Sequence, residues 1–369
     1  MREFSSAPLL WLGLMLAFAS IPMLPGIPAF WITLWGYIGI YSLVAIGLVL
    51  LTGVGGMTSF GQAAFVGFGA YTSAVLTSRY GWSPWATLPA VVLTTGLSAF
   101  LLGLVTVRLS GHFLPLGTIA WCISIFYLFG NVEALGRFDG ISGLPAFEVF
   151  GLSLASADRV FYLIWFVVLL AIIVSSNLLD SRMGRAIRAL RGGSQAAESF
   201  GVKTSHAKLI VFVYAALLAG VAGWLYAHVQ RAVSPSPFGV NAGIEFLLMA
   251  VLGGSGYVLG GVLGATIVTI LKDHLQSLLP KLIGSDGNFE TVVFGILMVV
   301  ILQVARQGLW PMIARFLPQA KPQEIDKTAA PLSRRVMPEK GSLILNVEKA
   351  RMQFGGLVAV NDVSFKVSA

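Results

Sequence analysis

Residues 180–208 contain the ionisable side chains whose spacing says most about chemistry. Six Lys and Arg residues stand there against two carboxylates, which gives this stretch a net charge of +4. Arg185, Arg188 and Arg191 follow one another at intervals of three, so a helix would present them along one face. Such a face can hold a protein partner or anionic headgroups by charge, but it offers neither a nucleophile nor a general base.

The remaining residues with chemical potential show no catalytic or metal-binding spacing. Cys122 is the single cysteine and lies in an apolar run, so an internal disulfide is impossible, and the four histidines are scattered. We find no paired carboxylates, no Ser/His/Asp arrangement and no phosphate-binding G-x-x-x-x-G-K-[ST] pattern. We therefore expect neither an enzyme nor a metal or cofactor site in this chain.

The segments that must position the basic stretch are strongly apolar. The chain is 56% hydrophobic and 11% charged, and no Asp, Glu, Lys or Arg occurs from Phe4 to Ser78. A bilayer span needs roughly 20 apolar residues, and its backbone must bond within the segment. The composition predicts an all-α polytopic membrane protein with about 9–10 transmembrane or re-entrant helices. The expected spans are 7–24 (an anchor rather than a cleaved signal peptide), 28–51, 62–78, 84–107, 113–132, 160–179, 209–228, a broken pair within 243–271, and 289–308.

Loop charges predict the orientation of these spans. The loop 132–159 carries a net charge of −2, whereas 180–208 carries +4, so the second loop is expected in the cytoplasm. The N-terminus and the C-terminus are expected on the same side. This rule also accounts for the net charge of +8 without nucleic acid. An even number of crossings must then follow the basic loop, so 243–271 is expected either to re-enter or to cross twice, and both alternatives stay open.

The C-terminal residues change character and predict separate domains. Residues 311–341 contain five prolines and mixed charges, which is typical of a linker. Val363, Phe365 and Val367 alternate with polar residues, and a similar strand is expected near residues 343–347, with a bend at 354–356. We expect a membrane domain at 1–310, a cytoplasmic linker at 311–341, and at 342–369 a β-hairpin from a soluble domain that the chain does not finish.

Glycine-rich interruptions recur in two places. Gly55-Gly56 and the glycines after it resemble Gly253-Gly254 and the glycines after that pair, which suggests two weakly related halves. Interrupted helices at corresponding places point to a translocation path, although glycines also serve close helix packing. Polar residues between 58 and 62 either contact a passing solute or bond to neighbouring helices. The path candidates are Gly55, Gly56, Thr58, Ser59, Gln62, Glu245, Gly253 and Gly254.

Glu245 is the one charged residue between Arg231 and Lys272. Carboxylates within a membrane are candidates for function. The alternative is structural, because Glu245 is expected in the first turn of a helix near the membrane surface, where an acid complements the helix dipole.

Residues 194–201 predict a short surface helix within the basic stretch. Ser194 is expected to cap a helix that runs to about Phe200, and Gly201 is expected to end it in a left-handed conformation. Ala196 and Ala197 would then present a small, smooth surface to a partner. The arginines alone could be a positive-inside anchor, but that explanation leaves the helix and its glycine stop without a role.

Several motifs in order resemble the membrane subunits of the branched-chain amino acid ABC importer family. These are LTGVGGMTSFGQAAFVGFGAY, GISGLP, QAAESFG followed by GVAGWLYA, and LLMAVLGGSGYVLGGVLGA, and the M-type permease is the more similar type. The resemblance implies an ATP-driven importer in the bacterial inner membrane. It also implies a sister permease, two ATPase subunits that carry ATP–Mg, and a periplasmic binding protein. The expected ATPase-coupling helix and its flank comprise Arg185, Arg188, Ala196, Ala197, Glu198 and Gly201.

The tail LILNVEKARMQFGGLVAVNDVSFKVSA resembles the first strands of the ATPase subunit of the same importers. The resemblance matches Phe354 to the aromatic residue that stacks on adenine. The tail is therefore expected to be part of a permease–ATPase fusion or a vestigial start.

Two other functions remain open at this point. The same family could import urea or short amides. A secondary transporter or channel is the third hypothesis, and it is disfavoured because four of the expected spans lack any charged residue for ion coupling. The sequence leaves open both the solute and whether the pore pairs with a sister permease or a second copy.

Overall fold

The computed structural model describes residues 20–24, 26, 28–109, 111, 113–149, 151–283, 289–304, 308–315 and 337–369. The chain divides into two compact units, 1–320 and 321–369. The expected first span, 7–24, falls outside the described residues except for its end, which holds the 3-10 turn η1, Ile21–Met23. Most of the expected linker, 316–336, also lies outside them.

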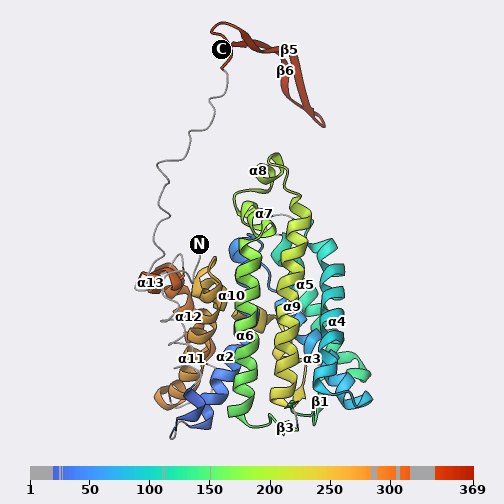
Figure 1. Ribbon diagram of the computed structural model, residues 1–369, viewed down its shortest axis with the longest axis vertical. Helices are drawn as coiled ribbons and strands as arrows, with labels where there is room; N and C mark the ends of the chain where they lie inside the picture. Colours follow the sequence, from blue (N-terminus) through green and yellow to red (C-terminus); the bar gives the residue numbers. More distant parts are fainter. Residues whose placement is uncertain are drawn as a thin grey trace, which may run out of the picture. The chain divides into compact units, whose positions relative to one another are not determined.

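The first unit is a bundle of helices joined by short connections (Figure 1). The long helices agree with the expected spans to within a few residues, except that α11 continues to Ile283, well beyond the expected end of the broken pair at residue 271. They are α2 (Ala29–Leu48), α3 (Gln62–Tyr80), α4 (Pro84–Thr106), α5 (Phe113–Asn131), α6 (Ala157–Asp180), α9 (Thr204–Gln230), α10 (Val240–Gly254), α11 (Val258–Ile283) and α12 (Phe289–Val304). Shorter elements are the π-helix η2 (Val49–Val54), η3 (Glu133–Leu135), α7 (Arg182–Arg191), α8 (Ser194–Ser199), η4 (Ser236–Phe238) and α13 (Trp310–Ala314).

Six helical segments in the described part of the chain are long and apolar enough to cross a membrane. They are Ala29–Val54, Pro84–Thr106, Phe113–Asn131, Ala157–Asp180, Thr204–Gln230 and Val258–Leu278. The first of them is mostly buried and lies inside the bundle, whereas α4 is mostly exposed along its apolar side chains. Exposed apolar side chains on the outer helices are what a lipid environment requires.

Helices α3 and α9 approach each other closely because glycines line their contact. A Cβ atom on Gly69 would overlap the backbone of Gly220, and a Cβ on Gly223 would overlap the backbone of Val66. Small residues at such contacts let helix backbones pack by van der Waals forces, the main attraction available in lipid. For these positions the packing explanation of the glycines is confirmed.

One end of the bundle is closed by short strands. Strand β1 (Ile141–Ser142) pairs antiparallel with β4 (Ala232–Val233), and β2 (Glu148–Val149) pairs with β3 (Leu152–Ser153). The GISGLP motif therefore docks on the segment after α9. The opposite end carries α7 and α8 (Figure 1).

The expected interruption within 243–271 is a turn between α10 and α11. Residues 233–254 run from the β1–β4 end to the α7 end, because Val233 pairs with Ile141 whereas Gly256 lies beside Arg191. Helix α11 then returns, and its His274 ring stands 6.2 Å from the ring of Trp31 at the start of α2. The structure thus favours two crossings over a re-entrant hairpin.

The second unit, considered by itself, is a hairpin of β5 (Leu343–Phe354) and β6 (Leu357–Ser368). The strands are antiparallel, with Leu345 opposite Val367, and Gly355 takes a φ of +57° in the turn. Both expected strands and the bend are confirmed. Phe354 is 62% exposed in this hairpin.

Candidate functional site

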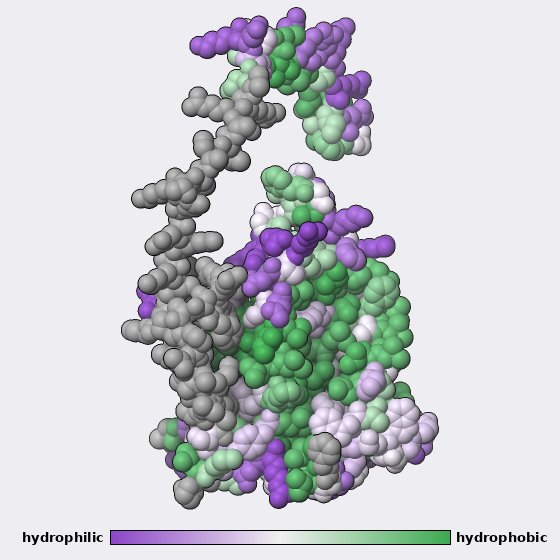
Figure 2. Space-filling model, viewed as in Figure 1, coloured by the Kyte–Doolittle hydropathy of each residue, from purple (hydrophilic) through white to green (hydrophobic). Residues whose placement is uncertain are grey.

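Helix α7 presents its arginines outward, as the spacing predicted. The Ser181 hydroxyl caps the helix by accepting a hydrogen bond from the Gly184 amide at 3.2 Å. Ile187 and Leu190 are buried on the inner face, and the three arginines at 185, 188 and 191 are exposed. Figure 2 shows hydrophilic residues gathered at this end, next to a broad hydrophobic surface. The geometry provides a cationic face that a partner can reach.

The start of α8 differs from the prediction, whereas its end agrees. Gly193, with a φ of +121°, is the N-cap, and Ser194 is already helical and makes no capping hydrogen bond. Glycine adopts this conformation without strain, so it displaces serine from the cap position. At the other end Gly201 has a φ of +80°, and the Val202 amide donates to the Ala197 carbonyl at 3.1 Å. The predicted left-handed stop is confirmed.

The surface of α8 is not the pair of alanines that the sequence suggested. Ala196 is exposed, but Ala197 is only 4% exposed and faces inward. Phe200 is 90% exposed at the end of the helix and is a surface residue that was not among the predicted site residues. The signal was present, because a large apolar side chain directly before a glycine stop in a polar stretch has no core to enter.

Glu198 holds α8 against the next long helix. Its carboxylate accepts a hydrogen bond from the hydroxyl of Thr204, the first residue of α9, at 2.5 Å. A hydrogen bond to a charged acceptor is stronger than one between neutral groups. The hydrogen bond thus links α8 directly to the first residue of α9.

The two glycine-rich interruptions meet at the α7 end of the bundle. A Cβ on Gly53 would lie 2.8 Å from the Cα of Ser255, which shows direct backbone contact between the two breaks. Arg191 stands beside both, since its Cα lies 3.7 Å from a Cβ built on Gly56 and its guanidinium 3.9 Å from one built on Gly256. The structure thus brings together the regions of four predicted path residues, Gly55, Gly56, Gly253 and Gly254.

The glycines at this meeting point also serve packing. Gly253 faces the backbone of Gly260 and Gly264 on α11, so any side chain there would overlap it. Gly55 and Gly253 are buried, whereas Gly56 is exposed and has a φ of +68°. The alternative that glycines permit close approach is confirmed for Gly253, and this role does not conflict with a neighbouring path.

The polar residues of the first interruption divide into two groups. Ser59 stabilises the local turn, because its hydroxyl accepts a hydrogen bond from the Gly61 amide at 3.3 Å. Thr58 is half-buried. Gln62 is 1% exposed, and neither of its amide atoms has a hydrogen-bond partner. An unsatisfied buried polar group costs about 1–3 kcal/mol, so Gln62 is the one of the three whose placement calls for a function.

Glu245 lies in the second turn of α10, and the first-turn prediction is wrong. The helix begins at Val240, and its free backbone amide groups lie in the first turn. The Glu245 carboxylate lies one turn further along and does not meet them. Its partner is instead Lys272 of α11, whose Nζ lies 2.6 Å from Glu245 Oε1. Sequence reasoning named Lys272 only as a boundary of the uncharged stretch and missed it as a site residue.

The Glu245–Lys272 pair borders a pocket of about 330 Å³. Helices α2, α3, α9, α10 and α11 contribute to its wall together with η4. Aromatic rings form much of this wall, with the Tyr41 and Phe246 centroids 5.6 Å apart and those of Tyr226 and Phe238 5.8 Å apart. The pocket therefore combines two opposite charges with an apolar surface.

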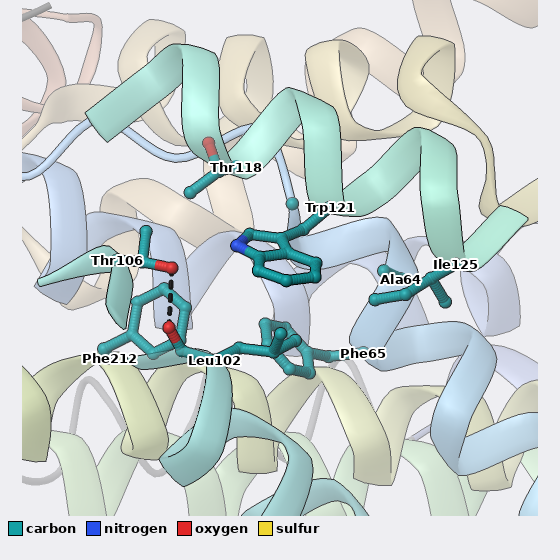
Figure 3. A pocket seen from close by; sticks show the side chains of 9 residues that line it. Ala64, Phe65, Leu102, Thr106, Thr118, Trp121, Ile125 and Phe212 are labelled. Atoms are coloured by element: carbon teal, nitrogen blue, oxygen red, sulfur yellow. Dashed lines mark hydrogen bonds between the residues drawn. The ribbon is translucent and has the colours of Figure 1, made fainter. Parts of the chain in front are cut away.

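A second hollow, shown in Figure 3, has no charged side chain. It is a narrow groove of about 10 Å³, and Trp121 of α5 and Phe65 of α3 extend toward each other across it. Its threonines are committed elsewhere, since Thr106 donates to the Leu102 carbonyl at 2.6 Å and Thr118 to the Pro115 carbonyl at 2.8 Å. The groove offers no polar recognition of a solute.

Comparison with known proteins decides the family. A sequence model for the family described as "Branched-chain amino acid transport system / permease component" matches residues 30–302. The chain belongs to this family. It is a family of transport permeases and not of enzymes. Because six helices in the described part of the chain are long and apolar enough to cross a bilayer, this permease is a multi-pass membrane protein.

Relatives of this permease are of both membrane-subunit types. The high-affinity branched-chain amino acid transport system permease protein LivM of Salmonella typhimurium is 31% identical over 298 residues, which cover 74% of this chain and 68% of the relative. LivM of Escherichia coli K12 has the same identity and coverage. LivH of Salmonella typhimurium is 24% identical over 305 residues, or 73% of this chain and 90% of the relative. These three are named for branched-chain amino acids, and no solved structure matches the chain.

Proposed function

We propose that this chain is a membrane-spanning permease subunit of an ATP-driven ABC importer that translocates branched-chain amino acids. The family match over residues 30–302 carries the proposal, because it spans α2 to α12 and thus nearly the whole described bundle. Nothing in the pocket or in the named relatives favours urea or short amides. An M-type subunit is the better fit, since identity is 31% to LivM and 24% to LivH.

The proposed orientation places α7 and α8 in the cytoplasm of a bacterial cell, with the permease in the inner membrane. The positive-inside rule supports this, because the arginines of α7 are exposed at one end of the bundle. The two crossings of α10 and α11 leave an even number of spans after the basic loop. The N- and C-termini then both lie in the cytoplasm.

The proposed partners follow from the surfaces at the α7 end. The exposed Phe200 ring and the arginine face suit a groove on an ATPase subunit, with aromatic and Arg side chains being the common anchors of interfaces. Two ATPase subunits, a sister permease and a periplasmic binding protein complete the proposed importer. The binding protein would deliver the solute at the β1–β4 end.

Coupling in this proposal runs from α8 into the bundle. Movement of α8 by the ATPase pulls α9 through the Glu198–Thr204 hydrogen bond. Movement of α7 shifts Arg191, which stands beside both glycine breaks. Rigid helices that rock about such breaks would open and close a path, as expected for closure around a transported ligand.

The C-terminal hairpin is proposed to be the start of an ATPase domain of the same importer. The proposed domains are a permease at 1–310, a linker at 311–341 and the ATPase fragment at 342–369. The separation of residues 321–369 as a compact unit supports a distinct C-terminal part. Phe354 offers an exposed ring to adenine, but the 369 residues contain no phosphate-binding loop. We therefore assign ATP–Mg to partner ATPase subunits.

Uptake by the reconstituted importer tests the function. Proteoliposomes that contain this chain, its sister permease, the ATPase subunits and the binding protein should accumulate leucine only with ATP. Dissipation of the proton and sodium gradients should leave the rate unchanged, and excess urea should not compete. Uptake that follows an ion gradient without ATP would contradict the proposal and support a secondary transporter.

A further inference from the structure

We propose that the pocket beside Glu245 and Lys272 binds the amino acid as a zwitterion during its passage. This inference rests on the proposed function and adds a solute site to it. Glu245 is assigned to the ammonium group of the solute and Lys272 to its carboxylate. The rings and aliphatic side chains opposite them are assigned to the branched side chain.

The depth of the ion pair supports this assignment. Glu245 lies nine residues before the end of α10, which places it about 14 Å along the helix from the turn at the α7 end. Lys272 lies 14 residues after the start of α11, about 21 Å along that helix from the same turn at about 1.5 Å per residue. Lys272, two residues before His274, lies toward the end where α11 reaches the start of α2, whereas Glu245 stands within the bundle. Charged groups at such a depth are expensive and mark solute or ion pathways.

The ion pair is also accessible from the pocket. The side chain of Lys272 is 39% exposed and that of Glu245 is 30% exposed, and both border the pocket. A sealed ion pair is often no better for stability than apolar residues of the same size. An ion pair that a solute can reach can bind the charged groups of that solute, which apolar residues cannot do.

The walls of the pocket suit a small branched side chain. Ile40, Val44 and Val66 line it together with the rings of Tyr41 and Phe246. Ligand pockets range from about 300 to about 1,000 Å³, so a volume of about 330 Å³ admits only a small solute. A few polar groups among apolar walls fix the orientation of a ligand.

A zwitterion can replace the ion pair without leaving a charge alone. The Lys272 ammonium donates to the solute carboxylate, while the solute ammonium donates to Glu245, so one ion pair becomes two. An amino acid amide or a simple carboxylate brings only one charge and leaves one protein group unpaired. A charge left without its partner in a partly desolvated pocket is unfavourable. The pocket should therefore prefer zwitterions.

Gln62 lies one helical turn from the pocket wall, on the side of the α7 end. Val66 lines the pocket, and Gln62 precedes it by one turn on the same face of α3. The buried, unpartnered amide of Gln62 offers the next polar contact. The chain from Gln62 back to Gly53 then leads to the place where the two breaks meet.

Direct binding of leucine to the permease–ATPase complex in lipid nanodiscs, without binding protein, tests this site. Equilibrium dialysis with radiolabelled leucine should show saturable binding that leucinamide and 4-methylpentanoate displace at least tenfold less well than valine. Glu245→Gln and Lys272→Gln should each weaken leucine binding at least tenfold and slow ATP-driven uptake. Glu133→Gln is the matched control, because it breaks an exposed ion pair with Arg137 at 3.6 Å and should change neither.

The exchanged variant, Glu245→Lys with Lys272→Glu, separates binding from folding. It restores an ion pair, so assembly of the complex should recover, while leucine binding stays weak because the apolar walls fix the solute's orientation. Full recovery of leucine binding would show that the ion pair only holds α10 and α11 together, and it would overturn the proposed assignment of Glu245 and Lys272 to the solute. Wild-type affinity in both single variants would overturn it too, as would a complex that transports leucine but shows no binding up to millimolar solute. If the wild-type importer moves no branched-chain amino acid at all, the proposed function itself fails.

Discussion

Glu198 of α8 accepts a hydrogen bond from the hydroxyl of Thr204, the first residue of α9. The two side chains lie 2.5 Å apart, across the turn that Gly201 makes. The hydrogen bond therefore joins α8 to the first residue of a long helix of the bundle. Glu198 is thus assigned a positioning role, whatever it also contacts on a partner.

Removal of this tie should uncouple ATP hydrolysis from uptake. Glu198→Ala and Thr204→Val each delete one side of the hydrogen bond, which is stronger than one between neutral groups because the acceptor is charged. We expect leucine uptake per ATP hydrolysed to fall several-fold in both variants, with the complex still assembled. Parallel measurements of uptake and phosphate release on the same proteoliposomes check this. Unchanged stoichiometry in both variants would remove the tie from the coupling route.

The contact of the two breaks predicts that Gly53 tolerates no side chain. A Cβ there would lie 2.8 Å from the backbone of Ser255, and overpacking of this kind typically costs about 1–3 kcal/mol. Gly53→Ala should lower the thermal midpoint of the purified permease and slow uptake. Gly295→Ala is the matched control, because no atom lies within 4 Å of its Cβ position in α12. The control should be neutral or slightly stabilising, since alanine favours helix over glycine.

The orientation predicts which side of the membrane each end of the bundle faces. Phe200→Cys places a thiol on α8, and Leu152→Cys places one on β3 at the other end, where the leucine is 63% exposed. An impermeant maleimide on intact cells whose outer membrane has been made permeable should label position 152 and not position 200. Inside-out vesicles should give the reverse. Labelling of position 200 from the periplasm would overturn both the orientation and the proposed ATPase contact. The native Cys122 is buried and serves as the background control.

Local patterns in the sequence were enough to predict most of the fold. Apolar length set the spans, and Gly254 and Gly256 marked the break between α10 and α11, because helices in lipid must satisfy their own backbone and glycine readily leaves helical conformation. Gly201 marked the end of α8 for the same reason. The alternation in β5 and β6 likewise needed no information from distant residues.

Details that depend on how helices face one another could not be read from the sequence. The Glu245–Lys272 pair joins two helices across a break, and its geometry depends on how α10 rotates against α11. The inward side of α8 was also undetermined, because a helix of six residues has too few apolar positions to define a face. Hence Ala197 was expected outside, whereas Phe200, which is outside, was overlooked.

Gln62 offers a test of whether an unsatisfied buried group is kept for transport. Its amide lies buried at the start of α3 with no hydrogen-bond partner, so Gln62→Leu should stabilise the permease by about 1 kcal/mol or more. Uptake should nevertheless fall, because the polar contact between the Glu245 pocket and the glycine breaks is lost. Thr95→Val is the matched variant, since the Thr95 hydroxyl is also buried without a partner but lies on α4, which contributes no residue to the pocket wall, whereas α3 contributes Val66 one turn from Gln62. It should raise the thermal midpoint and leave uptake unchanged. A Gln62→Leu permease that is more stable and fully active would show that the amide has no part in the path.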